Sequence, residues 1–178
     1  MAGKTLEKGL LIVHTGPGKG KSTAAFGLAL RILGRGHRIG VVQFVKGAWH
    51  TAERDALKAF GDQVAWYTMG EGFTWETQDL ARDIAAAERA WGKSLELMAD
   101  PSFALVILDE LNIALRYEYL DLATVVAALT ARRSGLHVVV TGRNAKPEMI
   151  AAADLVTEMT LVKHHFAAGV KAQPGIEF

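Results

Sequence analysis

The sequence predicts an α/β protein with a single doubly wound, mostly parallel sheet and helices on both faces of that sheet. Two observations predict this fold. Short, nearly continuous apolar runs alternate along the chain with segments of helical periodicity, which is the pattern of parallel strands covered on both sides. A glycine-rich stretch also joins the first apolar run directly to the first helix. Sheets of this kind bind ligands beyond the carboxyl ends of their strands.

The first half of the chain supplies three of the expected strands. A compact apolar run at residues 10–14 predicts a buried strand that leads into the glycine-rich stretch. Ala, Leu and Phe then recur at helical spacing over residues 21–33, and Gly34 and Gly36 end that helix. Residues 39–45 are β-branched and aromatic, which predicts a second strand. A short helix is expected over residues 51–60 and a third strand over residues 64–69.

The second half continues the alternation. Its clearest helix is expected over residues 77–98, where one stripe holds Leu80, Ile84, Ala87, Trp91, Leu95 and Met98. A continuous apolar strand is expected over residues 104–108. The remaining predicted elements are a helix over 122–132, a strand over 136–141, a short helix from Pro147 and a strand over about 155–160. No repeat or linker divides the chain, so we expect one domain over residues 1–178, with residues 1–9 as a flexible leader.

The composition excludes several classes of protein. The net charge is +1, so no basic field favours binding to nucleic acid or to a membrane surface. The sequence has no cysteine, which excludes disulfides and thiolate metal sites and is typical of a reducing compartment. No apolar run has the length of a membrane span or of a signal-peptide core. We therefore expect a cytoplasmic protein.

The glycine-rich stretch Thr15-Gly-Pro-Gly-Lys-Gly-Lys-Ser-Thr23 has the chemistry of a phosphate-binding loop. Backbone N–H groups at a helix N-terminus bind phosphate oxygens, Lys21 adds a full positive charge, and the Ser22 hydroxyl suits Mg²⁺. The pattern G-x-x-x-x-G-K-[ST] puts Thr15 where its first glycine belongs, so the glycines stand in a different register. Pro17 has no N–H, and the backbone donors therefore begin at Gly18. The competing interpretation is a tight turn without a ligand.

The strand over residues 104–108 ends in Asp109-Glu110, as the acidic strand of a phosphate-loop protein does. Mg²⁺ or Mn²⁺ prefers oxygen ligands, so Ser22 and one of these carboxylates would form a suitable metal set together with the phosphates. The spacing leaves open whether Asp109 or Glu110 is the direct ligand. A solvated acidic loop is the alternative.

Other candidate residues are more ambiguous. Phe73 and Trp75 lie in the glycine-flanked stretch Gly70-Glu-Gly-Phe-Thr-Trp75, where large aromatic side chains either attach the loop to the core or serve function. Arg143 follows a predicted strand and either reaches phosphate or is solvated. The six histidines have no spacing that requires a metal site.

Together these segments resemble one family, the P-loop ATP:corrinoid adenosyltransferases. The resemblance spans nearly the whole chain in order, although Pro17 stands where many relatives have a polar residue. Its matching segments are Thr15–Gly27, Val42-Gln-Phe-Val-Lys-Gly47, Gly70–Trp75, Leu108-Asp-Glu-Leu-Asn112, Val140-Thr-Gly-Arg143, Val162-Lys-His164, Gly169–Gln173 and Gly175-Ile-Glu-Phe178.

The resemblance implies a RecA-like fold, a homodimer and a specific reaction. Co(I) of a reduced corrinoid attacks the 5′ carbon of ATP, and triphosphate leaves. The phosphate loop then holds the leaving group, and the residues implied in binding triphosphate or acting on it are Gly16, Gly18, Lys19, Gly20, Lys21, Ser22, Thr23 and Arg143. Ser22 and Glu110, or Asp109, would hold the metal ion.

In the family, aromatic residues of the loop at 70–75 displace the lower axial ligand of the corrinoid, which makes Co(II) easier to reduce. The resemblance therefore gives Phe73 and Trp75 a catalytic and corrinoid-binding role, alongside Lys21 and Glu110. It also implies a reduced flavin or a flavodoxin-like partner as electron donor. The residues leave two alternatives open: a RecA-like ATPase or small-molecule kinase, and a non-enzymatic corrinoid carrier. They also leave open which corrinoid is the substrate.

Overall fold

A computed structural model describes residues 8–45, 51–70 and 79–177. Six parallel strands form one sheet in the order β3-β2-β4-β5-β1-β6. The predicted α/β fold with a parallel sheet is confirmed. The strands are β1 (Leu11–Thr15), β2 (Arg38–Gln43), β3 (Val64–Thr68), β4 (Phe103–Asp109), β5 (His137–Thr141) and β6 (Leu155–Glu158).

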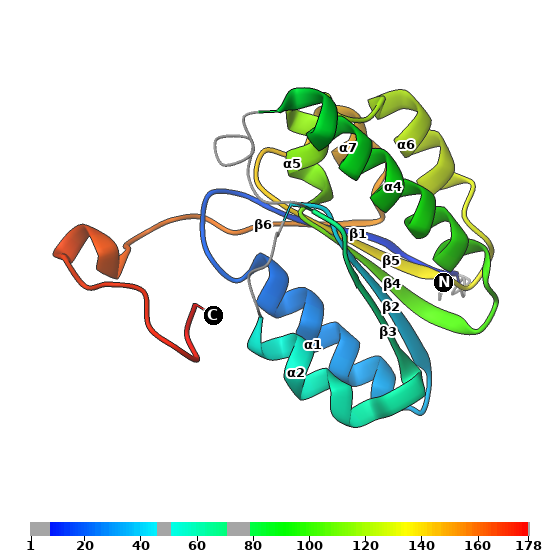
Figure 1. Cartoon of the computed structure of the whole chain (residues 1–178), viewed down its shortest axis with the longest axis horizontal. Coiled ribbons are helices and arrows are strands. Elements are labelled where there is room, and N and C mark those ends of the chain that lie inside the picture. The colour runs from blue at the N-terminus through cyan, green and yellow to red at the C-terminus, as the bar shows by residue number, and fades with distance from the viewer. Residues whose placement is uncertain (1–7, 46–50, 71–78, 178) are drawn as a thin grey trace, which may run out of the picture.

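Helices cover both faces of this sheet (Figure 1). One face carries α1 (Lys21–Leu33) and α2 (Ala52–Leu57), with a 3₁₀ segment, η1 (Lys58–Gln63), after α2. The other face carries α4 (Leu80–Ala99), α5 (Leu111–Arg116), α6 (Leu122–Thr130) and α7 (Pro147–Ala152). Each face has its own apolar cluster, and the four central strands contribute side chains to both clusters. This double burial explains why the strands are continuously apolar in sequence.

Most predicted elements are present with shifts of a few residues at their ends. The helix α5 was not predicted, because its six residues follow β4 directly and are too few to show a helical period. A second 3₁₀ segment, η2 (His165–Ala168), lies in the C-terminal segment, where no element was expected. Within the described residues, no helix has the length and apolar character needed to cross a membrane.

The predicted apolar stripe of α4 is partly wrong. Leu80 and Leu95 are 58% and 40% exposed, whereas Ala86, Ala90 and Leu97 are buried. The face against the sheet is thus displaced around the helix, and three of the eight buried residues of α4 are alanines. Two polar residues, Asp83 and Ser94, are also buried on α4. The Ser94 hydroxyl is satisfied by donating to the Ala90 carbonyl oxygen at 2.7 Å.

The carboxyl ends of parallel strands lie at the same end of the sheet, and this brings distant segments of the chain together. The glycine-rich loop follows β1, Gln43 ends β2, Asp109 ends β4 and Thr141 ends β5. At the opposite end of the sheet, where the strands begin, the two described residues of the expected leader contact the rest of the protein. Lys8 pairs with Asp154, and the Gly9 carbonyl oxygen accepts from Arg132 Nη2 at 2.6 Å.

Candidate nucleotide-binding site

The glycine-rich loop is shaped by close contact with the chain that leaves β6. Gly16 has a φ of 97°, and a Cβ atom on it would lie 2.5 Å from the Met159 carbonyl oxygen. The Gly18 N–H donates to the same oxygen at 2.6 Å. In this conformation, therefore, the first donor expected after Pro17 is used inside the protein. Gly20, with a φ of 102°, then turns the chain into α1.

Lys21 lies inside the loop. Its Nζ donates to the Gly16 carbonyl oxygen at 3.0 Å and also to that of Gly18, and the residue is 8% exposed. Burial lowers the pKa of Lys21 by removing its ammonium group from water, while the negative charge of Glu110 acts in the opposite direction. The positive charges of Arg143 and Lys19 lower this pKa further. Four predicted site residues are thus near enough to interact electrostatically.

Asp109 accepts hydrogen bonds from three side chains at the edge of the sheet. Its Oδ1 accepts from the Ser22 hydroxyl at 2.7 Å and from the Thr141 hydroxyl at 2.8 Å, and its Oδ2 accepts from Gln43 Nε2 at 3.0 Å. Asp109 is fully buried. The Ser22 proton is directed at Asp109, so the lone pairs of that hydroxyl are left for a cation.

Glu110 is placed by the turn between β4 and α5. It has a φ of 64°, and its N–H donates to the Thr141 hydroxyl at 2.9 Å. Gly142 lies against this turn with a φ of 126°, and a Cβ atom there would be 2.9 Å from Asn112 Cβ and 3.1 Å from Glu110 Oε2. The strand ends of β4 and β5 therefore fix the position of Glu110 together.

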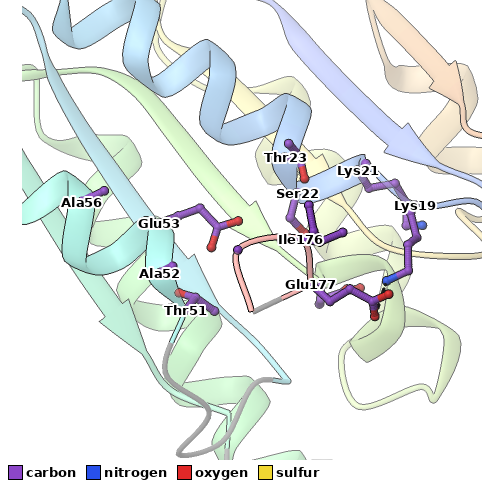
Figure 2. Close-up of a pocket in the computed structure, with 13 residues that line it drawn as sticks. Lys19, Lys21, Ser22, Thr23, Thr51, Ala52, Glu53, Ala56, Ile176 and Glu177 are labelled. Atoms are coloured by element: carbon purple, nitrogen blue, oxygen red, sulfur yellow. Dashed lines mark ion pairs between the residues drawn. The ribbon is translucent and has the colours of Figure 1, made fainter. Parts of the chain in front are cut away.

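A pocket of about 520 Å³ lies over the start of α1. Its walls are residues 19–23 of the loop and α1, the start of α2, Glu110 and the C-terminal residues Gly175, Ile176 and Glu177 (Figure 2). In Figure 1 the orange and red C-terminal segment leaves β6 and returns toward α1 and α2. The pocket thus contains the cationic loop and two candidate metal ligands, Ser22 and Glu110, and it is large enough for a nucleotide.

The contribution of the C-terminus was missed from the sequence. Lys19 Nζ pairs with Glu177 Oε2 at 2.8 Å, and His165 Nε2 lies 2.8 Å from Glu177 Oε1. The hydrogen bond from Lys19 holds the pKa of Glu177 below its usual value. Lys19 and Glu177 each lie in a segment that the sequence singled out, but nothing in the spacing of the two segments indicated that they are in contact.

His164, His165 and Glu177 form the one cluster among the described residues that has the ligand spacing of a metal site. Lys19 Nζ pairs with Glu177 Oε2, His165 Nε2 faces Glu177 Oε1, and His164 Nδ1 accepts from the Phe166 N–H at 3.1 Å.

Phe73 and Trp75 lie outside the described residues, as do Lys46 and Gly47. The chain leading to this loop is fixed, however. The N–H groups of Met69 and Gly70 donate to the Gln43 carbonyl oxygen at 3.1 and 3.2 Å. A Cβ atom on Gly70 would lie 2.5 Å from the Phe44 carbonyl oxygen, so only glycine fits that close approach.

Comparisons with known proteins agree on one family. Residues 7–178 match the family described as ATP:corrinoid adenosyltransferase BtuR/CobO/CobP. The chain is 59% identical to a corrinoid adenosyltransferase of Pseudomonas aeruginosa, over 97% of this chain and 85% of that protein. It is 47% identical to the corrinoid adenosyltransferase CobA of Salmonella typhimurium, over 97% of this chain and 87% of that protein.

Two solved structures show the same fold at low sequence identity. The flagellar accessory protein FlaH of Methanocaldococcus jannaschii has a TM-score of 0.54 and 13% identity, covering 88% of this chain and 73% of its own. The RadB recombinase has a TM-score of 0.52 and 17% identity, covering 90% of this chain and 79% of its own. They support the RecA-like, P-loop type of α/β fold.

Proposed function

Because this chain belongs to the ATP:corrinoid adenosyltransferase BtuR/CobO/CobP family and is a corrinoid adenosyltransferase, we propose that it uses ATP and a Co(I) corrinoid as its two substrates. In the proposed reaction the electron pair of Co(I) attacks the 5′ carbon of ATP and forms the Co–C bond. The bond between that carbon and the α-phosphate oxygen breaks, and its electrons leave with triphosphate. Cobalt is formally oxidised from Co(I) to Co(III), and the 5′ carbon accepts the two electrons as its C–O bond is replaced by the Co–C bond, so no additional oxidant is needed.

The observation that best supports this proposal is the placement of Lys21 and Ser22 in one pocket with Glu110. Cobalt is the nucleophile, so the protein needs no nucleophile or general base of its own. Its tasks are to orient ATP and to stabilise the charge that develops on the leaving triphosphate. Fixed positive charges and backbone donors are the groups that perform those tasks.

Lys21 is proposed to bind the triphosphate. In the described conformation its amine donates hydrogen bonds to the carbonyl oxygens of Gly16 and Gly18 in its own loop. These oxygens accept the hydrogen bonds that we propose a phosphate would accept in the complex. A phosphate oxygen would be a stronger, charged acceptor for the same amine. Gly16, Gly18, Lys19, Gly20, Thr23 and Arg143 are proposed to complete the set around the phosphates.

The oxygen donors at this site fit Mg²⁺ or Mn²⁺. The Ser22 hydroxyl and the Glu110 carboxylate are hard oxygen ligands, as Mg²⁺ requires. We propose Glu110 as the carboxylate nearest the cation, because the Asp109 oxygens already accept from Ser22, Thr141 and Gln43. A cation bound there would neutralise charge on the departing triphosphate.

Phe73 and Trp75 are proposed to contact the corrinoid and to favour reduction of Co(II), with a reduced flavin or a flavodoxin-like protein as electron donor. This part of the proposal rests on family membership. It predicts that Trp75→Ala slows adenosylation much more when Co(II) must be reduced in the assay than when Co(I) is supplied chemically. Equal losses in the two assays would contradict the role in reduction. A cytoplasmic homodimer is proposed on the same basis.

Product identity tests the reaction itself. The enzyme is incubated without oxygen with ATP, Mg²⁺ and chemically reduced cobalamin, and the products are separated by ion-exchange chromatography. Triphosphate and a light-sensitive adenosylcobalamin should appear in equal amounts. Formation of ADP and phosphate, with no change in the corrinoid spectrum, would instead indicate an ATPase or a kinase.

A further inference from the structure

Gln43, at the carboxyl end of β2, is buried within the polar network of the site. It is 1% exposed. Its Nε2 donates to Asp109 Oδ2 at 3.0 Å. Its Oε1 accepts from Trp66 Nε1 at 3.1 Å and from the Thr68 hydroxyl at 2.9 Å. The amide therefore connects two side chains of β3 to the carboxylate at the end of β4.

The chemistry of its neighbours permits only one orientation of this amide. The Trp66 indole N–H is a donor and never an acceptor, while an ionised Asp109 carboxylate is an acceptor and never a donor. Only with Oε1 toward Trp66 and Nε2 toward Asp109 are both satisfied. The indole is itself held in place, because its ring stacks on Phe26 of α1 with centroids 5.1 Å apart.

This orientation has a consequence at Ser22. With Oδ2 of Asp109 held by Gln43, the other oxygen is aimed at the Ser22 and Thr141 hydroxyls. Asp109 then fixes the Ser22 proton, and the lone pairs of that hydroxyl are available to the cation. Without the donor from Gln43, a buried carboxylate would lose one of its hydrogen bonds and the constraint on its rotation.

We propose that Gln43 is a positioning residue of the metal–phosphate site, which acts through Asp109 on the Ser22 hydroxyl. The inference rests on the proposed function, since it requires a cation at Ser22. The plainer alternative is that Gln43 only joins β2 to β3. Its backbone carbonyl oxygen accepts from the N–H groups of Met69 and Gly70, which follow β3. The two views differ on the role of the side-chain nitrogen Nε2, because that is the Gln43 atom that donates to Asp109.

Two substitutions within the network separate these views. Gln43→Met keeps the length of the side chain and removes both the donor to Asp109 and the acceptor for Trp66 and Thr68. Thr68→Val weakens only the acceptor end of this network, since it removes the hydrogen bonds of the Thr68 hydroxyl to Gln43 and Trp66 and leaves Nε2 in place. Affinity for ATP is measured by titration calorimetry with Mg²⁺ and again with EDTA. The ratio of the two affinities gives the Mg²⁺-dependent part of binding, and thermal unfolding confirms that each variant is folded.

We expect Gln43→Met to lower this ratio about tenfold, as is usual when a residue that orients a metal ligand is lost. Thr68→Val should leave it unchanged, and Thr141→Val, which removes another donor to Asp109, should lower it. If Gln43→Met and Thr68→Val give equal ratios, the positioning role is overturned. Ser22→Ala tests the premise separately: if the ratio of that variant equals the wild-type ratio, the cation does not bind at Ser22 and the proposed function fails there.

Discussion

The Ser22 hydroxyl donates a 2.7 Å hydrogen bond to Asp109 Oδ1, which joins the phosphate loop to the end of β4. This contact gives Asp109 and Glu110 different surroundings, although they are adjacent in sequence and both acidic. Asp109 is fully buried and accepts from the protein, whereas Glu110 lines the pocket. The structure thereby separates two carboxylates that spacing could not distinguish.

Asp109→Asn should raise the Mg²⁺ concentration needed for half-maximal adenosylation about 10- to 100-fold, since the neutral amide is a poorer acceptor for Ser22. The rate is measured with chemically supplied Co(I), so that reduction does not limit it. Asp121→Asn is the control, because Asp121 also accepts from a neighbouring threonine but caps α6 away from the pocket. An unchanged Mg²⁺ requirement in Asp109→Asn would contradict the proposed orientation of Ser22.

Lys21→Ala should abolish measurable ATP binding in titration calorimetry, because the variant loses the one full charge buried within the loop. Lys58→Ala is the matched control, since Lys58 is exposed and pairs with Asp55 at 2.6 Å. Retention of wild-type affinity by Lys21→Ala would remove the loop from the nucleotide site.

The lowered pKa of Lys21 gives a prediction about pH. Burial holds this pKa below the ordinary 10.5, so the unfolded chain binds the Lys21 proton more tightly than the folded chain does. The Lys21 contribution to the stability of the ATP-free protein therefore increases as the pH rises from the folded pKa toward 10.5. Affinity for ATP should fall over the same range, since the amine loses its charge. Denaturant unfolding of the wild type and of Lys21→Met isolates the effect on stability, and calorimetry of the wild type follows the affinity for ATP. Parallel unfolding profiles in the two proteins, or a wild-type affinity that stays constant over this pH range, would contradict the prediction.

Glu177→Gln should lower the KM for ATP about twofold, as expected for an ion pair whose lysine is exposed to solvent. The carboxylate competes with phosphate for Lys19, and the amide would not. Glu96→Gln is the control because it removes a comparable ion pair, with Lys93, on α4. A higher KM in Glu177→Gln would show instead that Glu177 helps Lys19 to bind ATP.

The same ion pair should respond to acid. The pKa of Glu177 is lowered from 4.5, so its pair with Lys19 is complete above that value and is lost as the pH falls through the lower, folded pKa. Protection of residues 165–177 from hydrogen exchange, taken relative to the intrinsic exchange rate at each pH, should then fall at acidic pH in the wild type. In Glu177→Gln the protection should already be low at neutral pH; high protection there would contradict the role of the pair in holding the segment.

Gly142→Ala should destabilise the protein by about 2–4 kcal/mol, through a strained positive φ and an overfilled contact. It should also reduce activity, because the new methyl group would displace Glu110. Gly135→Ala is the control: Gly135 has a φ of 84°, but a Cβ atom there would meet no described atom within 4 Å, so only the backbone strain applies. Chemical denaturation measures the free energy of unfolding of each variant. Equal losses of stability in the two variants would show that the contact of the new methyl group at residue 142 adds nothing to the backbone strain.

The local sequence was sufficient for the phosphate loop and for the order of the elements. Lys21 and Ser22 follow an apolar strand and begin a helix, and this chemistry is contained within one short stretch. The stripe of α4 was less predictable, because many alanines give several possible apolar faces and packing against β2 and β4 selects one of them. The short helix α5 could not be predicted because it depends on the turn at Glu110.

The sequence by itself therefore determined the α/β class and the family, and it supplied the residues that we propose around the phosphates, since each of these depends on local pattern or on motifs read in order. Only the tertiary structure decided how the surroundings of the two adjacent carboxylates differ, that Gln43 connects Trp66 to Asp109, and that Glu177 reaches Lys19. These contacts join residues far apart in the chain. They exist because parallel strands place their carboxyl ends side by side, a proximity that spacing along the sequence does not record.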